Sequence, residues 1–371
     1  MKVTQEQVLA WRLRQQSLEP RTTATVEQLV GRLAGVQAQV ASAAELAIGT
    51  RRRTPRPGAV ERALADRTVV RTWSMRGTLH LLLPEQMAAF QSLLAAARTW
   101  EKPSWQRSFG VTPTQMTALG DAVEEILGDD ALTRQELTEA VVARPGFGEL
   151  REQLTSGWGT VLKPLAWTGR LCHGPNRGNR TTFVTPRSHV PGWSGIPEPE
   201  EAARTAIPAY LRAHGPATAE AFDAWLIRGL SRKAVLRSLF AAAGDLLTSV
   251  EVDGEPAWIR TEDADALART KPSKAVRLLS GFDQYVLGPG TADPRVIPAS
   301  RRKAVSRTGG WIAPVVVHRG RVAGVWDVVD DTVDVQLFPE SGAVPADGLE
   351  AEAAHLARCT GEVRELRVRT V

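Results

Sequence analysis

The amino-acid sequence predicts an α+β protein made of three tandem winged-helix modules and a C-terminal β-rich, barrel-like part. Two observations lead to this prediction. A run of helix-forming sequence followed by a hairpin signal occurs three times, at spacings of about 80 to 100 residues, which is typical of tandem modules rather than of a solenoid. From Gly281 on, short β-rich runs separated by Gly and Pro replace the helical pattern. We expect domains at residues 1–110, 111–190, 198–270 and 271–371.

In the first unit, helices precede a hairpin over residues 68–81. The apolar spacing predicts the helices Thr4–Gln16, Thr25–Gly35 and Ala59–Asp66. Between the last two, Gln37 and Gln39 are the polar residues of a small, apolar segment that follows Gly35. Side chains two residues apart share a face in an extended chain but not in a helix. We therefore expect both amides to reach one point, and a polar pair that caps a helix is the alternative.

The second unit is expected over residues 111–190. Its first helix is Pro113–Leu127, and a second helix begins after Thr133, which forms a capping-box signature with Glu136. A third helix over Gly148–Thr168 precedes a hairpin over Leu171–Val184 with a Gly- and Asn-rich tip. This order predicts a winged helix.

The third unit repeats this order after the Pro- and Gly-rich linker Pro191–Pro199. Its helices are predicted at Glu200–Ala213, Thr218–Ile227 and Ser231–Ala243. Two strands, Leu246–Glu251 and Trp258–Arg260, surround Asp253-Gly254, a dipeptide that favours a hairpin turn.

The C-terminal part has β-rich runs. Strands are predicted at Val315–Val317, Arg321–Val325 and Thr332–Leu337, followed by a helix near Leu349–Arg358 and a last strand at Glu362–Val368. These runs predict a small sheet or barrel.

Basic residues are unevenly distributed. Residues 1–110 hold 16 Lys or Arg against 8 acids and residues 290–321 hold 7 against 1, whereas residues 326–353 hold 8 acids and no Lys or Arg. This uneven distribution of charge predicts that one face of the protein binds a polyanion. The alternative is that the charges only form a solvated face. We expect phosphate contacts from Arg51, Arg52, Arg53, Arg56, Arg177 and Arg180. We also expect a hairpin probe for DNA in the stretch that begins at Arg301, Arg302 and Lys303 and ends at Trp311.

Several function classes are excluded by missing motifs. The sequence lacks the phosphate loop of ATPases, the G-x-S-x-G nucleophile elbow and the H-E-x-x-H zinc motif. Its two cysteines are far apart and its six histidines are scattered, so no metal, disulfide or cofactor is expected. No apolar stretch is long enough to span a bilayer, and the N-terminus lacks an export signal, so we expect a cytoplasmic protein.

Three segments together resemble the bacterial winged-helix DNA glycosylases. They are Gln37-Ala38-Gln39, the segment Trp73–Leu81 and the segment Phe282–Gly288. The resemblance covers essentially the whole chain and implies three winged helices and a β-rich part in a C-shape around duplex DNA. It implies that Gln37 and Gln39 are catalytic, and that alkylated bases and interstrand crosslinks of the azinomycin type, as in antibiotic self-resistance, are the substrates. From this resemblance we also expect the protein to work as a monomer in base excision repair at the nucleoid.

Two glutamines suffice for this chemistry because an N7-alkylated purine is already a cation, which leaves as a neutral base. The enzyme has only to stabilise the oxocarbenium-like sugar and place a water, which oriented carbonyl dipoles can do. No Lys is close to the motif in the sequence, so we expect a monofunctional glycosylase without a Schiff-base lyase step. Trp73, Trp326 and His80 are expected to be structural. A transcriptional regulator without enzymatic activity, or a protein that only sequesters the drug, remains the alternative.

Overall fold

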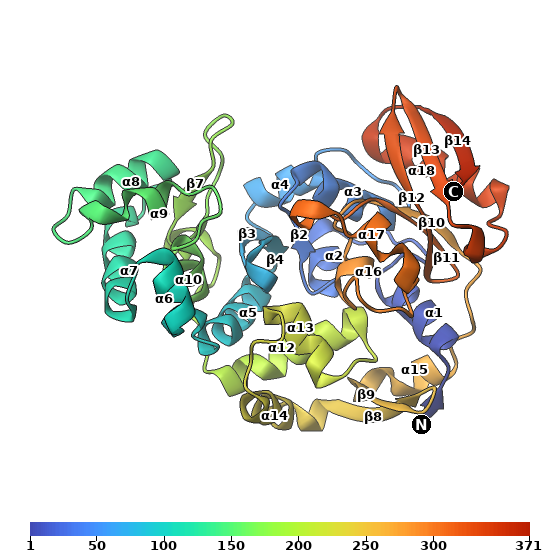
Figure 1. The fold of residues 1–371 in the computed structure, drawn as a ribbon, viewed down its shortest axis with the longest axis horizontal. Helices are drawn as coiled ribbons and strands as arrows, with labels where there is room; N and C mark the ends of the chain where they lie inside the picture. Colours follow the sequence, from blue (N-terminus) through green and yellow to red (C-terminus); the bar gives the residue numbers. More distant parts are fainter.

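The computed structural model describes residues 1–371 and contains three β-sheets surrounded by helices (Figure 1). No helix has both the length and the apolar character needed to cross a lipid bilayer. The structure is a mixed α+β fold, as the sequence predicts.

The first unit follows the order helix, strand, two helices and hairpin. Thr25 caps α2 with a complete capping box, and the small residues of α3 allow it to pack closely in the core of this unit. The sequence prediction missed α3 and α5, because neither has a capping side chain. The elements are α2 (Val26–Arg32), β2 (Val36–Gln37), α3 (Ala41–Arg51), α4 (Ala59–Ala65), β3 (Val70–Trp73) and β4 (Leu79–Leu82), followed by α5 (Pro84–Ala96) and α6 (Pro103–Phe109).

The second unit follows a similar order with one more short helix before the hairpin, and its strands join those of the first in one six-stranded sheet. The sheet order is β2-β4-β3-β6-β7-β5, and the pair Arg71 and His173 connects the two halves. The capping box of Thr133 is confirmed, but the third predicted helix is interrupted by a loop with Gly157 and Gly159. The elements are α7 (Pro113–Leu127), β5 (Leu132–Thr133), α8 (Arg134–Val142), α9 (Arg151–Thr155), α10 (Leu162–Trp167), β6 (Cys172–His173), β7 (Thr182–Val184) and α11 (Pro186–His189).

The third unit holds a three-stranded sheet of order β1-β8-β9. The extreme N-terminus supplies the edge strand, because Lys2 and Val3 pair in parallel with β8. The sequence predicts that α1 packs with the helices of the first unit, and that prediction is wrong. The helix instead packs between the third unit and the C-terminal sheet. The elements are β1 (Lys2–Val3), α1 (Gln5–Gln15), α12 (Pro199–His214), α13 (Ala219–Ile227), α14 (Lys233–Ala242), β8 (Leu247–Val252), β9 (Glu255–Arg260) and α15 (Ala264–Ala268).

The C-terminal part is an open five-stranded sheet and not a barrel, so the barrel-like prediction is wrong. Its order is β10-β11-β12-β13-β14, with β10 and β14 at the edges. Val315 and Val317 face a core that includes Leu9 and Leu13 of α1, whereas Val316 faces α18 on the opposite side. Helices therefore cover both faces, and no closure of the sheet is needed. The elements are β10 (Val276–Leu279), α16 (Gln284–Leu287), α17 (Arg302–Val305), β11 (Val315–His318), β12 (Arg321–Val329), β13 (Thr332–Leu337), α18 (Ala346–Thr360) and β14 (Glu365–Thr370).

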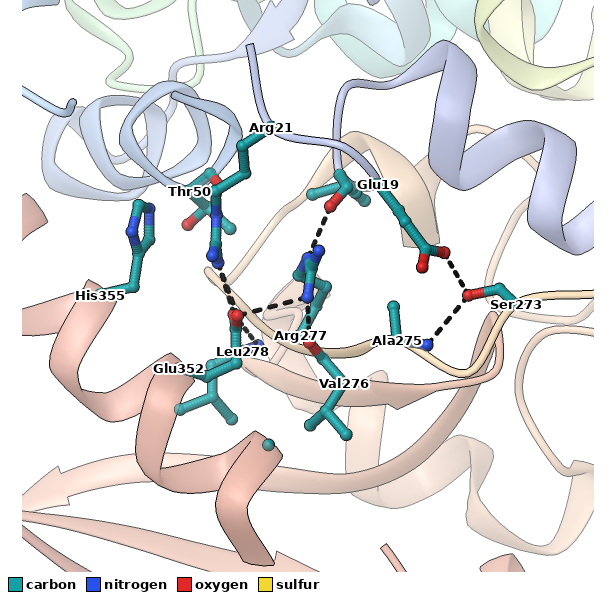
Figure 2. Close-up of polar contacts among 12 residues, drawn as sticks. Glu19, Arg21, Thr50, Ser273, Ala275, Val276, Arg277, Leu278, Glu352 and His355 are labelled. Carbon is teal, nitrogen blue, oxygen red and sulfur yellow. Dashed lines mark hydrogen bonds and ion pairs between the residues drawn. The ribbon is translucent and has the colours of Figure 1, made fainter. Parts of the chain in front are cut away.

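An ion pair between Glu352 and Arg21 fastens the C-terminal part to the first unit (Figure 2). Glu352 of α18 accepts from Arg21 at 2.7 Å and from Arg277 at 3.4 Å. Nearby, His355 Nε2 lies 3.2 Å from the carbonyl oxygen of Gly49. Because Glu352 and His355 are buried, these contacts fix the C-terminal sheet in place beside α3.

Candidate active site

A cavity of about 610 Å³ lies where all four parts of the chain meet. The first unit contributes Gln37 and Gln39 to its wall, and the C-terminal part contributes Phe282 and the segments 287–291 and 309–312. Further residues come from the second unit, among them Lys163, and from the α13 region of the third. The 24 lining residues include no Asp and no Glu. The structure therefore brings both predicted catalytic glutamines into one site.

Gln37 and Gln39 belong to an extended segment, as expected. Gln37 pairs with His80 across β2 and β4, and the backbone N–H of Ala38 donates to the Leu79 carbonyl at 2.8 Å. The Ala38 side chain enters the core of the first unit, while the glutamines on either side of it line the cavity. The N–H of Leu79 donates to Gln39 Oε1 at 3.3 Å, which fixes the orientation of that amide. Gln37 is only 6% exposed, so its amide is held by its surroundings.

Arg76 lies in the turn between β3 and β4 and connects Gln37 with the third unit. Its backbone has a φ of 58°, the left-handed region. Its Nη2 contacts Gln37 Oε1 at 3.5 Å, and its Nη1 donates to the Trp225 carbonyl at 2.9 Å. Burial and then the neighbouring Arg228 lower the pKa of Arg76 to about 10. Arg76 is thus a cation at neutral pH that faces the amide of Gln37.

His80 lies behind Gln37 and does not line the cavity. The side chain is fully buried, and Nδ1 is 3.0 Å from the Thr78 carbonyl oxygen. Burial, followed by the charge of Arg76, lowers the pKa of His80 to about 3, so the ring is neutral at physiological pH. It supports β4 and offers no proton to the cavity, which agrees with the structural role expected of it.

Tryptophans frame the cavity. Trp158, in the loop between α9 and α10, is 77% exposed, and Trp311 is 44% exposed. Trp73 also lines the wall but is buried, and Trp326 is buried in the C-terminal sheet, so both are core residues as predicted. Exposed indoles beside a cationic wall suit a nucleic acid, because its planar bases can stack on the indoles and its phosphates carry negative charge.

Arg51 is not available for a phosphate contact, and that prediction is wrong. Its side chain is 0% exposed and forms a two-pronged ion pair with Asp283, with both N···O distances 2.7 Å. The charge run Arg51-Arg52-Arg53 begins inside the last turn of α3, so its first member points into the core. Asp283 belongs to the segment Phe282–Gly288, and Phe282 beside it lines the cavity. This pair therefore positions one wall of the site.

The other predicted phosphate contacts are at least partly accessible. Arg53 and Arg56 are exposed and Arg52 is half-buried. Arg177 and Arg180 are exposed at the β6–β7 hairpin, where Arg177 also pairs with Glu136. The accessibility of these residues is compatible with DNA contact.

The basic stretch 301–311 is not a regular hairpin. Arg301 pairs with Glu340 and lies over the ring of Phe338, while Arg302 and Lys303 are exposed on the short helix α17. A single antiparallel bridge between Ser306 and Ile312 closes the loop that follows. Its tip reaches the cavity, because the residues Gly309, Gly310 and Trp311 line the wall.

Sequence reasoning missed three cavity residues, Lys163, Arg228 and Trp158. Lys163 is 126 positions from Gln37 along the chain, and only the packing of α10 on the β3–β4 hairpin brings it into the wall. Distance along the sequence therefore does not keep a lysine out of the cavity, and the absence of a lyase step stays a prediction. No local signal distinguishes these residues from ordinary surface residues. The structure holds no group of three or more His, Cys, Asp or Glu side chains arranged for a metal.

Helix-and-hairpin units around a cationic cavity, lined by amides and by no carboxylate, define the class of nucleic-acid-binding proteins. The chain matches the AlkZ-like DNA glycosylase family over residues 30–359. It is 51% identical to a protein named interstrand DNA cross-link repair glycosylase from Streptomyces sahachiroi, with 100% of both chains covered. The solved structure of Streptomyces sahachiroi DNA glycosylase AlkZ matches with a TM-score of 0.96 and 51% identity, covering 100% of each chain. The chain therefore belongs to the AlkZ-like DNA glycosylase family, enzymes that hydrolyse N-glycosyl bonds in DNA.

Proposed function

We propose that this protein excises N7-alkylated purines from duplex DNA and unhooks interstrand crosslinks formed through such purines, including those of the azinomycin type. The observation that supports this most is the placement of Gln37 and Gln39 in one cavity without a carboxylate. A site of this kind has no strong general acid, so it suits a leaving group that needs none. The name of the Streptomyces sahachiroi relative, an interstrand DNA cross-link repair glycosylase, favours crosslinks among the substrates.

The two amide oxygens act on the sugar rather than on the base. Gln39 Oε1 accepts one hydrogen bond from Leu79, and Gln37 Oε1 faces Arg76, so each carbonyl keeps acceptor capacity for a water molecule. As the bond from C1′ to the base nitrogen breaks, its electron pair leaves with the base, which thereby becomes neutral. The carbonyl dipoles face the positive charge that develops on the sugar and hold the water that captures it. The water then loses its proton to solvent.

The rest of the chain holds the DNA. The order of helix, strand, further helices and hairpin in the first two units, and the order of three helices and hairpin in the third, support three winged-helix modules. The proposed boundaries are 1–110, 111–190 and 198–270, with a C-terminal part over 271–371. In this proposal they form a C-shape around duplex DNA. The phosphate contacts are Arg52, Arg53, Arg56, Arg177, Arg180, Arg302 and Lys303. The protein works as a monomer in base excision repair, in the cytoplasm at the nucleoid.

Two further elements of the proposal concern the reaction product and the crosslink. The enzyme is monofunctional and leaves an abasic site, so borohydride should trap no covalent DNA adduct. The loop 306–312 acts as the probe at a crosslink, because a base tethered to the opposite strand cannot rotate freely into a closed pocket. Its tip already lines the cavity that holds both glutamines. A regulator without enzymatic activity is not favoured, since the family consists of glycosylases.

The experiment is single-turnover excision of 7-methylguanine from a duplex oligonucleotide. Gln37→Ala and Gln39→Ala should each lower the rate by about 10² to 10³, the usual cost of removing one preorganised polar contact. Gln106→Ala is the matched control, because Gln106 donates to the Glu101 carbonyl outside the cavity. Wild-type rates in both cavity variants would refute the assignment.

A further inference from the structure

Three basic side chains of the cavity have no acidic partner. They are Arg76 of the first unit, Lys163 of the second and Arg228 of the third, and all three line the wall that contains Gln37 and Gln39. Fifteen of the 39 arginines pair with a carboxylate, and none of the ion pairs of the structure includes any of these three cavity residues. A cation cluster without an anion is thus built into the site.

The three cations meet at one turn. Arg228 Nη2 donates to the carbonyl oxygen of Arg76 at 3.0 Å, and Lys163 Nζ lies 3.7 Å from the position that a Cβ on Gly77 would take. Arg76 and Lys163 are half-buried, whereas Arg228 is exposed. Burial, followed by the charge of Arg228, lowers the pKa of Lys163, as it does that of Arg76. No carboxylate of the protein therefore pairs with these three cations to offset the repulsion between them.

This arrangement conflicts with the chemistry unless the substrate supplies the missing charge. Glycosidic cleavage builds positive charge on the sugar, and three unpaired cations in the same cavity raise the energy of that state. The anions that accompany a damaged nucleotide into the cavity are its own phosphodiesters. Guanidinium and ammonium groups are the usual donors to phosphate oxygens.

We propose that Arg76, Lys163 and Arg228 form a phosphate-binding site for the phosphodiesters that flank the damaged nucleotide. The inference rests on the proposed function and deepens it. Bound phosphate neutralises the cluster, so the cavity becomes favourable to the cationic sugar only when the DNA backbone is in place. Since each cation comes from a different unit, binding of one nucleotide also holds the three units together around the lesion. In this role Lys163 is a phosphate ligand and not a Schiff-base nucleophile.

The test combines cation variants with neutral phosphates. A set of duplexes is made, each with one lesion and one methylphosphonate, which is an uncharged phosphodiester analogue. Across the set, the methylphosphonate replaces in turn each of the two phosphates on either side of the lesion. Binding is measured with the wild type, Lys163→Ala and Arg228→Ala, and with Arg204→Ala as the control, because Arg204 already pairs with Asp245. Thermal unfolding checks that each variant is folded.

We expect one or two methylphosphonate positions to weaken binding of the wild type about tenfold or more. In Lys163→Ala and Arg228→Ala, a methylphosphonate at the same position should weaken binding little further. The slope of log affinity against log salt should decrease in magnitude by about 0.9 for each variant. Arg204→Ala should behave as the wild type. An equal methylphosphonate effect in wild type and both variants at every position would overturn the phosphate site.

Lys163→Arg separates the two roles of the lysine, because it retains the charge but cannot form an imine. The phosphate role predicts near wild-type affinity for this variant and no borohydride-trapped adduct with the wild type. An adduct that forms with the wild type and disappears in Lys163→Arg would overturn the role assigned to Lys163. Binding is measured apart from excision, so a wild type that shows the methylphosphonate pattern but releases no base would refute the proposed function and support the phosphate site.

Discussion

The buried pair between Arg51 and Asp283 should contribute more to stability than any other single contact between the first unit and the C-terminal part. Both side chains are 0% exposed, and the Arg51 guanidinium donates twice to Asp283, once to the Ala47 carbonyl at 2.8 Å and once to Gln16 at 3.1 Å. Arg51→Met leaves a buried carboxylate without its cation, and removal of one partner from such a pair costs about 3–5 kcal/mol. We expect a loss of that size in the free energy of unfolding.

Urea unfolding followed by circular dichroism measures the loss. The double variant Arg51→Met/Asp283→Leu should recover most of it and remain about 1 kcal/mol less stable, because Asp283 also caps α16 through the Tyr285 N–H at 2.8 Å. Arg53→Ala is the comparison in the same charge run. Since Arg53 is exposed, its removal should change stability by less than about 0.5 kcal/mol but reduce the salt slope of DNA binding by about 1. If Arg51→Met costs under about 1 kcal/mol, the reasoning fails.

Three further predictions concern acid stability, the Trp158 loop and the crosslink probe. Burial, followed by the charge of Arg21, lowers the pKa of His355 to about 4, so between about pH 6.5 and 4 the unfolded chain binds a proton that the folded chain does not. Protonation of His355 alone should therefore lower stability by about 3 kcal/mol across that window as the pH decreases, in addition to the contribution of other buried histidines such as His80. The fall measured in urea titrations should be shallower by that amount in His355→Gln. Gly159→Ala should lower the free energy of unfolding by about 1–3 kcal/mol in thermal unfolding, because the backbone has a φ of 62° and a Cβ would lie 2.4 Å from Trp73. Gly157→Ala is the control and should change it little, because a Cβ there meets nothing within 4 Å. Replacing residues 307–310 by a short linker should impair crosslink unhooking more than excision of 7-methylguanine, and equal losses in both assays would contradict the probe.

The placement of Gln37 and Gln39 in one site could be predicted from the sequence because its signal is local. Gln37 and Gln39 stand in a short apolar segment that follows the well-capped helix α2, and both side chains line the same cavity. The three helix-and-hairpin runs were found for the same reason, since capping boxes and turn dipeptides lie within a few residues of the elements they begin or end.

What the sequence could not provide depends on distant partners. Whether an arginine of a charge run is exposed depends on its partner, and the partner of Arg51 is 232 positions away. The β-rich C-terminal runs predict strands but not closure, because the cover of one face is α1 from the other end of the chain. Lys163 entered the cavity through the packing of α10 on the first unit, which no local pattern indicates.

The central claim is that neutral amides are sufficient because alkylation at N7 has already activated the leaving group. The most direct measurement compares single-turnover release of two methylated bases by the wild type from otherwise identical duplexes. One is 7-methylguanine, which is a cation, and the other is O6-methylguanine, which carries the same methyl group without the charge. The account predicts release of 7-methylguanine and no detectable release of O6-methylguanine. Release of both bases at similar rates would contradict it.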